Sequence, residues 1–257
     1  MTLLSPAATD DCVAAVSHTF ASVFAHIEQW RSRVSELVAE HNAVVTAQNV
    51  DDLVEHLVLA ELERDDALII GAGFVATPGF LADTRWHLAW WLGHSNTFGL
   101  GAAGPSVRRL AATEDPTHES FRDYTDLEWW RVPASTGEAH ITGPYVDYLC
   151  TDDYTLTLTV PVLHEGAMIG IAGADLYVND IERTLLPYVR SIGSMATVVN
   201  ASGRVVVSTD PHRPTGSVLR VDELRARLAA AASGPVDLGD GRTLIACGGT
   251  SLGLVLG

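Results

Sequence analysis

The sequence predicts an α+β protein (α/β in the broad sense), in which a long N-terminal helix is followed by two lobes of unequal size, each with an antiparallel sheet. Apolar residues recur every three or four positions near the N-terminus, which is the spacing of an amphipathic helix. Further along, the period becomes the two residues typical of strands, and a second, shorter set of such segments repeats the pattern. The expected division is residues 1–65 for the N-terminal helices, 66–190 for the larger lobe and 191–257 for the smaller one.

The N-terminal helix is expected to run from about Asp10 to Gln48. No proline interrupts this segment, and either Asp10 or Asp11 can cap its start. A helix of this length can brace the body of its own chain or pair with a second copy in a homodimer, and both alternatives stay open. A second helix is expected over residues 50–65.

Strands of the larger lobe are expected at residues 67–76, 86–92, 139–147, 154–163 and 167–176. In the fourth of these segments Thr155, Thr157 and Thr159 alternate with apolar residues, which predicts an antiparallel sheet with one wetter face. Residues 164–166 are the expected hairpin between the last two strands. The helix that follows is expected over residues 179–189, with Asn179 as its N-cap.

The smaller lobe is predicted to contain strands at residues 196–200, 204–208, near 237, 243–247 and 252–256, and a helix at 221–232. A turn at Ala201-Ser202-Gly203 joins the first two strands, and a proline-containing loop precedes the helix. This order of elements is that of a PAS-like sheet module. The chain is therefore expected to contain two PAS-like lobes after its long helix.

Composition excludes one large class of function. The chain has 16 basic and 32 acidic residues, which give a net charge of −16. A protein that binds nucleic acid needs clustered Lys and Arg to neutralise phosphates, so no nucleic-acid partner is expected. A surface this acidic favours cationic ligands over anionic ones.

The cysteines and the lengths of the apolar runs predict the cellular compartment of the protein. Cys12, Cys150 and Cys247 are odd in number, far apart and without Cys-x-x-Cys spacing, so free thiols in a reducing compartment are expected. The N-terminus does not have the pattern of a signal peptide, and no apolar run approaches the roughly 20 residues that span a bilayer. A cytoplasmic location without a membrane partner is the expectation.

The residues with the most chemistry lie between Tyr124 and Asp175. Aromatic and acidic side chains alternate there, namely Tyr124, Trp129, Trp130, Tyr145, Asp147 and Asp175. Aromatic faces attract a positive charge, and a carboxylate pairs with it directly. The stretch therefore predicts a pocket for a small cationic ligand, and an ammonium group suits it better than an anion.

These residues also carry a family resemblance. Trp129-Trp130, Gly143-Pro144-Tyr145-Val146-Asp147, the threonine-rich strand ending in Pro161, the segment Gly170-Ile171-Ala172-Gly173-Ala174-Asp175 and, in the second lobe, residues 198–205 and 208–211 occur in a characteristic order. Over nearly its whole length the chain resembles the double Cache sensor domains. These are extracytoplasmic-type ligand-binding modules in which two PAS-like lobes follow a long helix.

The resemblance implies roles for individual residues. In family members that bind amines or amino acids, the ligand lies in the first lobe and the residue matching Asp175 holds its ammonium group. The other positions that resemble the pocket are Tyr124, Trp129, Trp130, Tyr145 and Asp147. Amino-acid binders have an arginine two residues before the first aromatic residue, where this chain has Leu127, and leucine cannot pair with a carboxylate. This departure favours an amine without an α-carboxylate, while Arg131 keeps amino acids and small carboxylates open.

Each of these residues also has a structural alternative. Trp129 and Trp130 could be core residues, and on an extended segment only one of them could face the pocket. Asp175 could cap the helix that follows it. Tyr145 and Asp147 could belong to an exposed turn.

The sequence predicts no enzymatic activity, because it contains none of the nucleophile-elbow, zinc-protease or phosphate-loop motifs. Residues 99–104 match a dinucleotide fingerprint formally, but no clean strand precedes them, so a glycine-rich loop is expected. The overall prediction is a sensor that binds a small molecule without a cofactor or metal ion and signals to an unknown output protein. An enzyme with an unrecognised site and a scaffold with a vestigial pocket remain alternatives.

Overall fold

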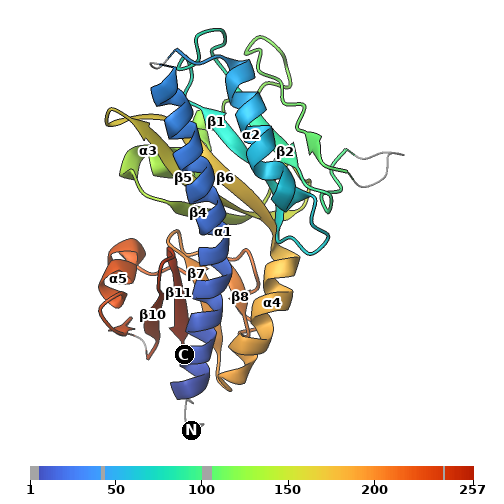
Figure 1. Cartoon of the computed structure of the whole chain (residues 1–257). Helices are drawn as coiled ribbons and strands as arrows, with labels where there is room; N and C mark the ends of the chain where they lie inside the picture. Colours follow the sequence, from blue (N-terminus) through green and yellow to red (C-terminus); the bar gives the residue numbers. More distant parts are fainter. Residues whose placement is uncertain (1–5, 42–43, 100–105, 240) are drawn as a thin grey trace.

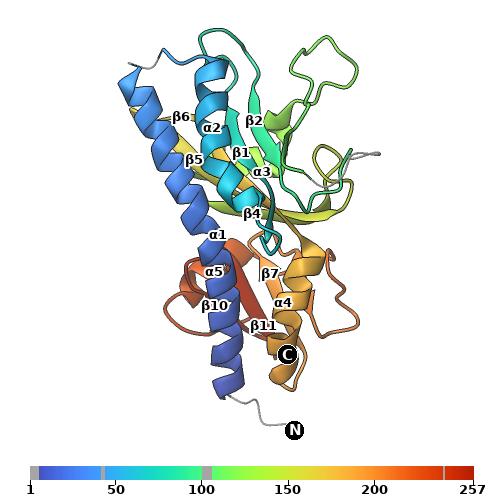
Figure 2. The ribbon, with the colours of Figure 1, turned by 45° about the vertical axis from the view of Figure 1, so that its right-hand side comes forward.

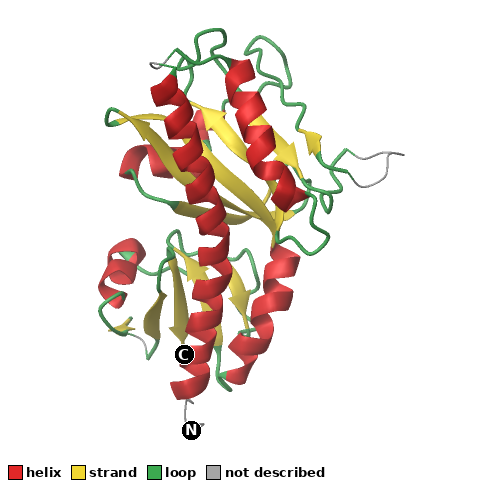
Figure 3. Ribbon diagram, in the orientation of Figure 1, coloured by secondary structure: helices red, strands yellow, loops and turns green. Residues whose placement is uncertain are grey.

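The computed structural model describes residues 6–41, 44–99, 106–239 and 241–257. Two antiparallel sheets lie one above the other, and helix α1 (Pro6–Glu40) runs past both of them (Figure 1). A view turned by 45° also shows α1 extending along both sheets (Figure 2). Helices and strands are combined in each half of the molecule (Figure 3), so the predicted α+β class is confirmed.

The bounds of the other elements follow the sequence patterns closely. The further helices are α2 (Ala47–Leu62), η1 (a 3-10 helix, Tyr124–Asp126), α3 (Glu128–Thr136), α4 (Val178–Ser191) and α5 (Leu224–Ala231). The first sheet contains β1 (Ile69–Ala76), β2 (Leu88–Leu92), β3 (Arg108–Arg109), β4 (His140–Val146), β5 (Tyr154–His164) and β6 (Ala167–Tyr177). The second contains β7 (Ala196–Asn200), β8 (Val205–Ser208), β9 (Val236–Asp237), β10 (Thr243–Cys247) and β11 (Leu252–Leu256).

Helix α1 braces both sheets within its own chain. Its buried side chains recur at helical spacing and are Thr9, Cys12, Val16, Thr19, Phe20, Val23, Ile27, Trp30, Val34 and Val38. The apolar ones among them belong to a single core cluster that also contains residues of both sheets. Pairing with a second copy stays a prediction. Neither α1 nor any other described helix has the length and apolar character needed to cross a bilayer.

Two details predicted for the N-terminal helix are wrong. The helix begins at Pro6, a residue that suits a first helical turn, so Asp10 and Asp11 lie inside it and do not cap it. A single helix to Gln48 is also wrong, because Thr46 starts α2. The Thr46 and Asn49 side chains form a reciprocal capping box, in which each accepts a hydrogen bond from the other residue's backbone N–H.

The first sheet has the order β3-β2-β1-β6-β5-β4 and is covered on both faces. One face packs against α1 and α2, and the other packs against α3 and the neighbouring loops. Thr155, Thr157 and Thr159 lie on the second face and are at most 4% exposed. The expectation of a wetter face is therefore wrong, because α3 covers it and Thr159 donates a hydrogen bond to Trp129 O (3.0 Å).

The second sheet has the order β8-β7-β11-β10-β9, and its strands occupy the predicted segments. In the first sheet the hairpin at Glu165 and Gly166 is confirmed, and both residues have positive φ (49° and 82°). The predicted cap at Asn179 is wrong. Helix α4 begins one residue earlier, and its N-cap is Tyr177.

Strand β4 is the point at which the two sheets meet. The Asn200 side chain, fully buried at the end of β7, donates hydrogen bonds to Ile141 O (3.1 Å) and Gly143 O (2.8 Å). Beside it, Ser202 Oγ donates to Glu128 Oε1 (2.7 Å), and this links the turn after β7 to the start of α3. The Asn200 hydrogen bonds thus reach β4 and the Ser202 hydrogen bond reaches α3, and both of these elements lead into the candidate site.

Candidate ligand-binding site

A small cavity lies on the face of the first sheet that α3 covers. Its walls are Val75, Leu88, Trp90, Trp129, Tyr145, Asp147, Leu149, Cys150, Thr157, Ile171 and Asp175. The centre of a water-sized sphere can occupy about 20 Å³ of it, which is room for little more than one water molecule. A larger ligand therefore requires the walls to move apart.

Asp175 lies inside the sheet, paired in register with Gly71 of β1 and Thr157 of β5. Its side chain is buried, and Thr157 Oγ1 donates a hydrogen bond to its Oδ1 (2.7 Å). The hydroxyl of Tyr145 is 2.8 Å from the same Thr157 oxygen, and because Thr157 has directed its single proton to the carboxylate, Tyr145 is the donor. This relay orients Asp175 toward the cavity. The helix-cap alternative for Asp175 is wrong, since Tyr177 holds that position.

Gly71 leaves the space that Asp175 and Trp90 share. A Cβ atom at Gly71 would lie 3.0 Å from Trp90 Nε1 and 3.4 Å from Asp175 Oδ2. The indole N–H of Trp90 is buried beside this carboxylate and interacts with it, but it makes no hydrogen bond of regular geometry within the described structure. The cavity thus contains one donor whose hydrogen bond is poorly formed.

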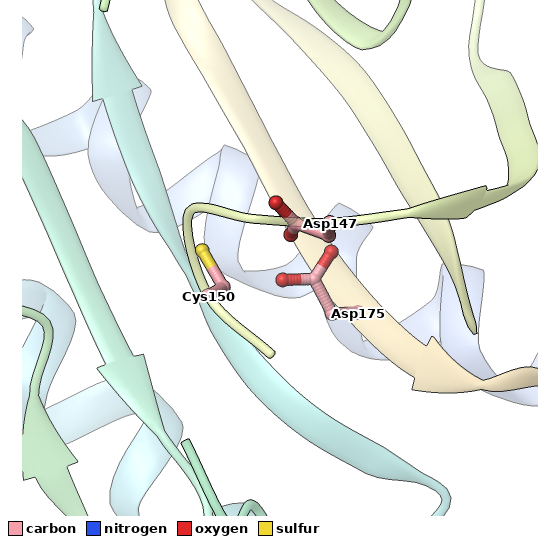
Figure 4. A group of neighbouring side chains, drawn as sticks. All are labelled: Asp147, Cys150 and Asp175. Carbon is pink, nitrogen blue, oxygen red and sulfur yellow. The ribbon is translucent and has the colours of Figure 1, made fainter. Parts of the chain in front are cut away.

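The loop after β4 supplies a second carboxylate and a thiol. Asp147 Oδ1 accepts a hydrogen bond from Leu149 N (2.9 Å), and Asp147 O accepts one from Asp152 N (2.8 Å), so the loop folds back on itself. As a result Cys150 faces the same space as Asp147. These two side chains and Asp175, which comes from β6, converge (Figure 4). One ligand atom from each of the three lies within 4.8 Å of the others.

Burial disfavours negative charge in this group. It raises the pKa of Asp147, and it raises the pKa of Asp175 well above its usual value, where the charge of Asp147 adds to the effect. Burial and the two carboxylates also raise the pKa of the Cys150 thiol. None of the cavity-lining residues is Arg, Lys or His, and the sequence contains no lysine. The two carboxylates therefore need either a shared proton or an incoming cation.

The structure brings four of the six predicted site residues together in the cavity wall, namely Trp129, Tyr145, Asp147 and Asp175. Tyr124 and Trp130 lie in the packed layer behind it. The ring of Tyr124 is 6.2 Å from that of Trp129 and 5.2 Å from that of Trp130, and its hydroxyl donates to Ala76 O (2.6 Å). Both tryptophans are on α3, so it is the helical geometry that directs only Trp129 to the cavity.

Other residues considered from the sequence lie elsewhere. Arg131 is exposed on α3 and is not part of the cavity wall. Residues 100–105, which make up most of the glycine-rich fingerprint, lie outside the described residues.

Sequence reasoning missed Trp90, Thr157 and Cys150 as wall residues. Successive residues of β2 point to opposite faces of the sheet, so Trp90 and Trp91 lie on different faces. This alternation could have identified Trp90 as a wall residue. The loop geometry that turns Cys150 inward has no such pattern.

Comparisons with known proteins identify relatives of the part of the chain that forms the cavity. Residues 89–183 match the family described as "Methyl-accepting chemotaxis protein-like, first PDC sensor domain". This segment contains every cavity-lining residue except Val75 and Leu88. No curated protein matches the chain.

Solved structures share the fold over nearly the whole chain. The ligand-binding domain of the Pseudomonas fluorescens chemoreceptor CtaA, in complex with L-valine, has a TM-score of 0.55 at 14% identity and aligns over 95% of this chain and 91% of its own. The ligand-binding domain of the Pseudomonas aeruginosa PAO1 chemoreceptor PctC, in complex with GABA, has a TM-score of 0.50 at 14% identity. It aligns over 96% of this chain and 94% of its own. The extracellular domain of the putative histidine kinase soHK1S-Z6 has a TM-score of 0.56 at 13% identity and aligns over 95% of this chain and 88% of its own.

Proposed function

We propose that the first lobe, whose residues 89–183 match the PDC (Cache) sensor-domain family, is a receptor for a small amine. One observation carries the proposal. Asp147 and Asp175 bring two buried carboxylates together, and no basic side chain lines the cavity beside them. An ammonium group would neutralise this pair.

The other wall residues have roles that follow from their positions. Asp175, held by Thr157, is the main anchor of the ammonium group, and Asp147 approaches it from the loop after β4. Trp129, Tyr145 and Trp90 supply aromatic faces that attract a cation. Tyr124 and Trp130 act indirectly, by fixing the orientation of Trp129.

The ligand class is supported by two further arguments. The chemoreceptor domains CtaA and PctC are in complex with L-valine and GABA, both of which carry an ammonium group. Both ligands also carry a carboxylate, but the cavity described above offers no guanidinium for one. We therefore favour an amine without an α-carboxylate over an amino acid held by Arg131.

Binding would be reported through the fold without catalysis. Strand β4 carries Tyr145 and leads to Asp147, and the same strand accepts the hydrogen bonds of Asn200 from the second lobe. A ligand that moves the loop after β4 would thus bias the arrangement of the two lobes and of α1. The output protein and the cytoplasmic location expected from the sequence stay predictions, and the soHK1S-Z6 relative is an extracellular domain.

The test is a binding screen with matched ligands and matched variants. Primary amines, diamines, amino acids and small carboxylates are compared by thermal shift and by isothermal titration calorimetry. A ligand at 100 times its Kd adds about 2.7 kcal/mol to the free energy of unfolding. The expected result is stabilisation by an amine, no stabilisation by its N-acetyl derivative, and loss of the effect in Asp175→Asn.

Asp126→Asn is the control, because it removes the same charge from an exposed position of the same lobe. If amines bind equally well to Asp175→Asn and to the wild type, the anchor is elsewhere. Stabilisation by carboxylates alone would instead support the alternative that uses Arg131.

A further inference from the structure

The group formed by Asp147, Cys150 and Asp175 has a chemistry that an amine does not use. A primary ammonium group pairs with the carboxylates but has no use for a thiol. One oxygen of each carboxylate and the sulfur of Cys150 are nevertheless within 4.8 Å of one another, and all three residues are buried. From this arrangement we infer that the cavity is also a binding site for a thiophilic divalent metal ion such as Zn²⁺.

The donor set fits such an ion. Zinc binds thiolate sulfur at about 2.3 Å and carboxylate oxygen at about 2.0–2.2 Å, in tetrahedral sites that often leave one position for water. The three atoms must close by roughly 1 Å to reach this geometry, a movement within the reach of the loop that carries Asp147 and Cys150. Asp175 provides the fixed ligand, because β6 and the Thr157 hydrogen bond hold it.

Trp90 gives an independent indication of what is bound. Its indole N–H is buried and lines the same cavity, and although Asp175 lies beside it, no described residue accepts a hydrogen bond of regular geometry from it. A water or hydroxide on the fourth position of the metal would present an oxygen lone pair to it. Three groups that become anionic ligands when a metal binds, with a poorly satisfied donor beside them, match a hydrated cation better than either a bare ion or an apolar ligand.

The size of the cavity agrees with this ligand. About 20 Å³ is accessible to the centre of a water-sized sphere, which is enough for an ion or one water molecule without opening the walls. The thiol must lose its proton to bind the metal, and the bound ion offsets the cost of that ionisation and of the two carboxylates. Binding is therefore accompanied by release of protons and strengthens as the pH rises.

The metal and the amine would share Asp147 and Asp175, so their binding is mutually exclusive. This competition rests on the proposed function, whereas the metal site itself does not. Cys150 separates the two proposals, since it is a direct ligand of the metal, whereas it would affect an ammonium group only through its hydrogen bond to Asp147. A thiophilic metal would thus act as an antagonist of the receptor at its own ligand site.

The test uses Co²⁺ as a spectroscopic probe and Zn²⁺ in calorimetry, with the whole chain. Co²⁺ bound to the wild type is expected to give a thiolate-to-cobalt charge-transfer band in the near ultraviolet. Added Zn²⁺ should remove this band. In Cys150→Ser the band should vanish and the Zn²⁺ affinity should fall at least about 100-fold, beyond the 10–100-fold effect of residues that only support metal ligands.

Two controls make the result decisive. Cys12→Ala/Cys247→Ala should keep the band, because these thiols are not part of the group. Circular dichroism of each variant establishes that it is folded. Absence of the band in the wild type, or its loss only in the Cys12/Cys247 variant, would overturn the metal site. Neither outcome would affect amine binding, which is measured separately on Cys150→Ser.

Discussion

Asp175 places a carboxylate where its surroundings disfavour charge. Only Thr157 gives it a hydrogen bond of good geometry, and its closest charged neighbour is another acid. Such a residue weakens the fold unless a cation or proton accompanies it. Its presence in the middle of a sheet is therefore easier to explain by ligand binding than by stability.

Replacing Asp175 with Asn is expected to stabilise the unliganded protein. The pKa of Asp175 is raised well above 3.8, so the folded state gains stability from its protonated form at low pH, and loses that stability as the pH rises through the raised pKa. At pH 8 Asp175→Asn should increase the free energy of unfolding, by about 1.4 kcal/mol for each unit by which the pKa of Asp175 is raised. Urea denaturation at pH 8 and pH 4 measures this, and the gain should shrink at pH 4.

The same pKa shifts predict how amine affinity depends on pH. Because both carboxyl groups hold protons more tightly than usual, an ammonium group must displace a proton at pH values below the raised pKa. Affinity should therefore rise with pH until the ligand amine itself loses its proton, near pH 10 for an alkylamine. Calorimetry in buffers of different ionisation enthalpy should detect the released proton. Affinity that is constant from pH 5 to 8 would contradict a buried carboxylate anchor.

Gly71 is a third residue whose effect can be measured. An added methyl group there would press on Trp90 Nε1 and Asp175 Oδ2, and overpacking of this kind costs about 1–3 kcal/mol. Gly71→Ala is expected to weaken amine binding about tenfold, equivalent to ~1.4 kcal/mol, as measured by titration calorimetry. Gly248→Ala is the matched control, because a Cβ at Gly248 meets nothing within 4 Å. Equal affinity in both variants would exclude a role for this contact.

At the scale of secondary-structure elements, His87 connects three segments beside the site. Its Nε2 is 3.0 Å from Asp51 of α2, and its Nδ1 is 3.0 Å from Glu114, whose carboxylate also accepts a hydrogen bond from Leu88 N (2.9 Å). Burial alone would lower the pKa of His87, but these two acids outweigh it and raise the pKa to about 9. The imidazolium therefore holds α2 and the 110–114 loop against β2.

This connection predicts a loss of stability at alkaline pH. A raised histidine pKa contributes stability that is complete below about pH 6.5 and is lost as the pH rises through about 9. The rise in the pKa of His87 from 6.5 to about 9 corresponds to roughly 3 kcal/mol in the free energy of unfolding. Urea denaturation of the wild type between pH 6.5 and 10 should show this decline, and His87→Gln should flatten it. His18→Gln, at an exposed position of α1, should leave the profile unchanged.

The strands could be predicted from the sequence more reliably than helix α3 and the loop after β4, which complete the wall of the cavity. The segments of β1, β5, β6 and β7 follow alternation or apolar runs, which depend only on local spacing. Helix α3 has no comparable signal, because it is short, contains Pro133 and is capped by the left-handed Gly137. Asp147 and Asp175 were predicted from the alternation of aromatic and acidic residues and from the family resemblance, whereas Cys150 reaches them only through the fold of the loop after β4.

At the scale of the whole molecule, Asn200 joins the two lobes. Its side chain donates to two carbonyl groups of β4 and accepts hydrogen bonds from Ser202 N (3.0 Å) and Arg204 N (2.9 Å). Asparagine is the side chain that can donate and accept in this way from one buried position. The joint thus fixes β4, and with it the wall of the cavity, against the second sheet.

Asn200→Ala should therefore affect both stability and the response to ligand. It leaves buried carbonyl and N–H groups without partners, and a loss of about 3 kcal/mol in the free energy of unfolding is expected. Urea denaturation measures this, with Asn179→Ala as the exposed control on α4. Stability within about 0.5 kcal/mol of the wild type, the range of ordinary surface substitutions, would mean that the joint does not carry the contact between lobes.

The overall architecture could be predicted because both lobes repeat one pattern after a long amphipathic segment. The break between α1 and α2 could not, because apolar spacing continues across it and only the Thr46–Asn49 pair marks the new start. The buried threonine face of β5 was also missed. A period of two shows that a strand has two different faces, but it cannot show whether the polar one is covered by another element.

The central position of β11 has a consequence for synthesis of the chain. Strand β11 pairs with β7 on one side and β10 on the other, although about 50 residues separate it from β7 in sequence. While the protein emerges from the ribosome, β7 must keep one backbone edge unpaired until Leu252–Leu256 is made. Exposed strand edges of this kind recruit other chains. Nascent chains stalled before Leu252 would therefore be the forms of this protein that most need a chaperone.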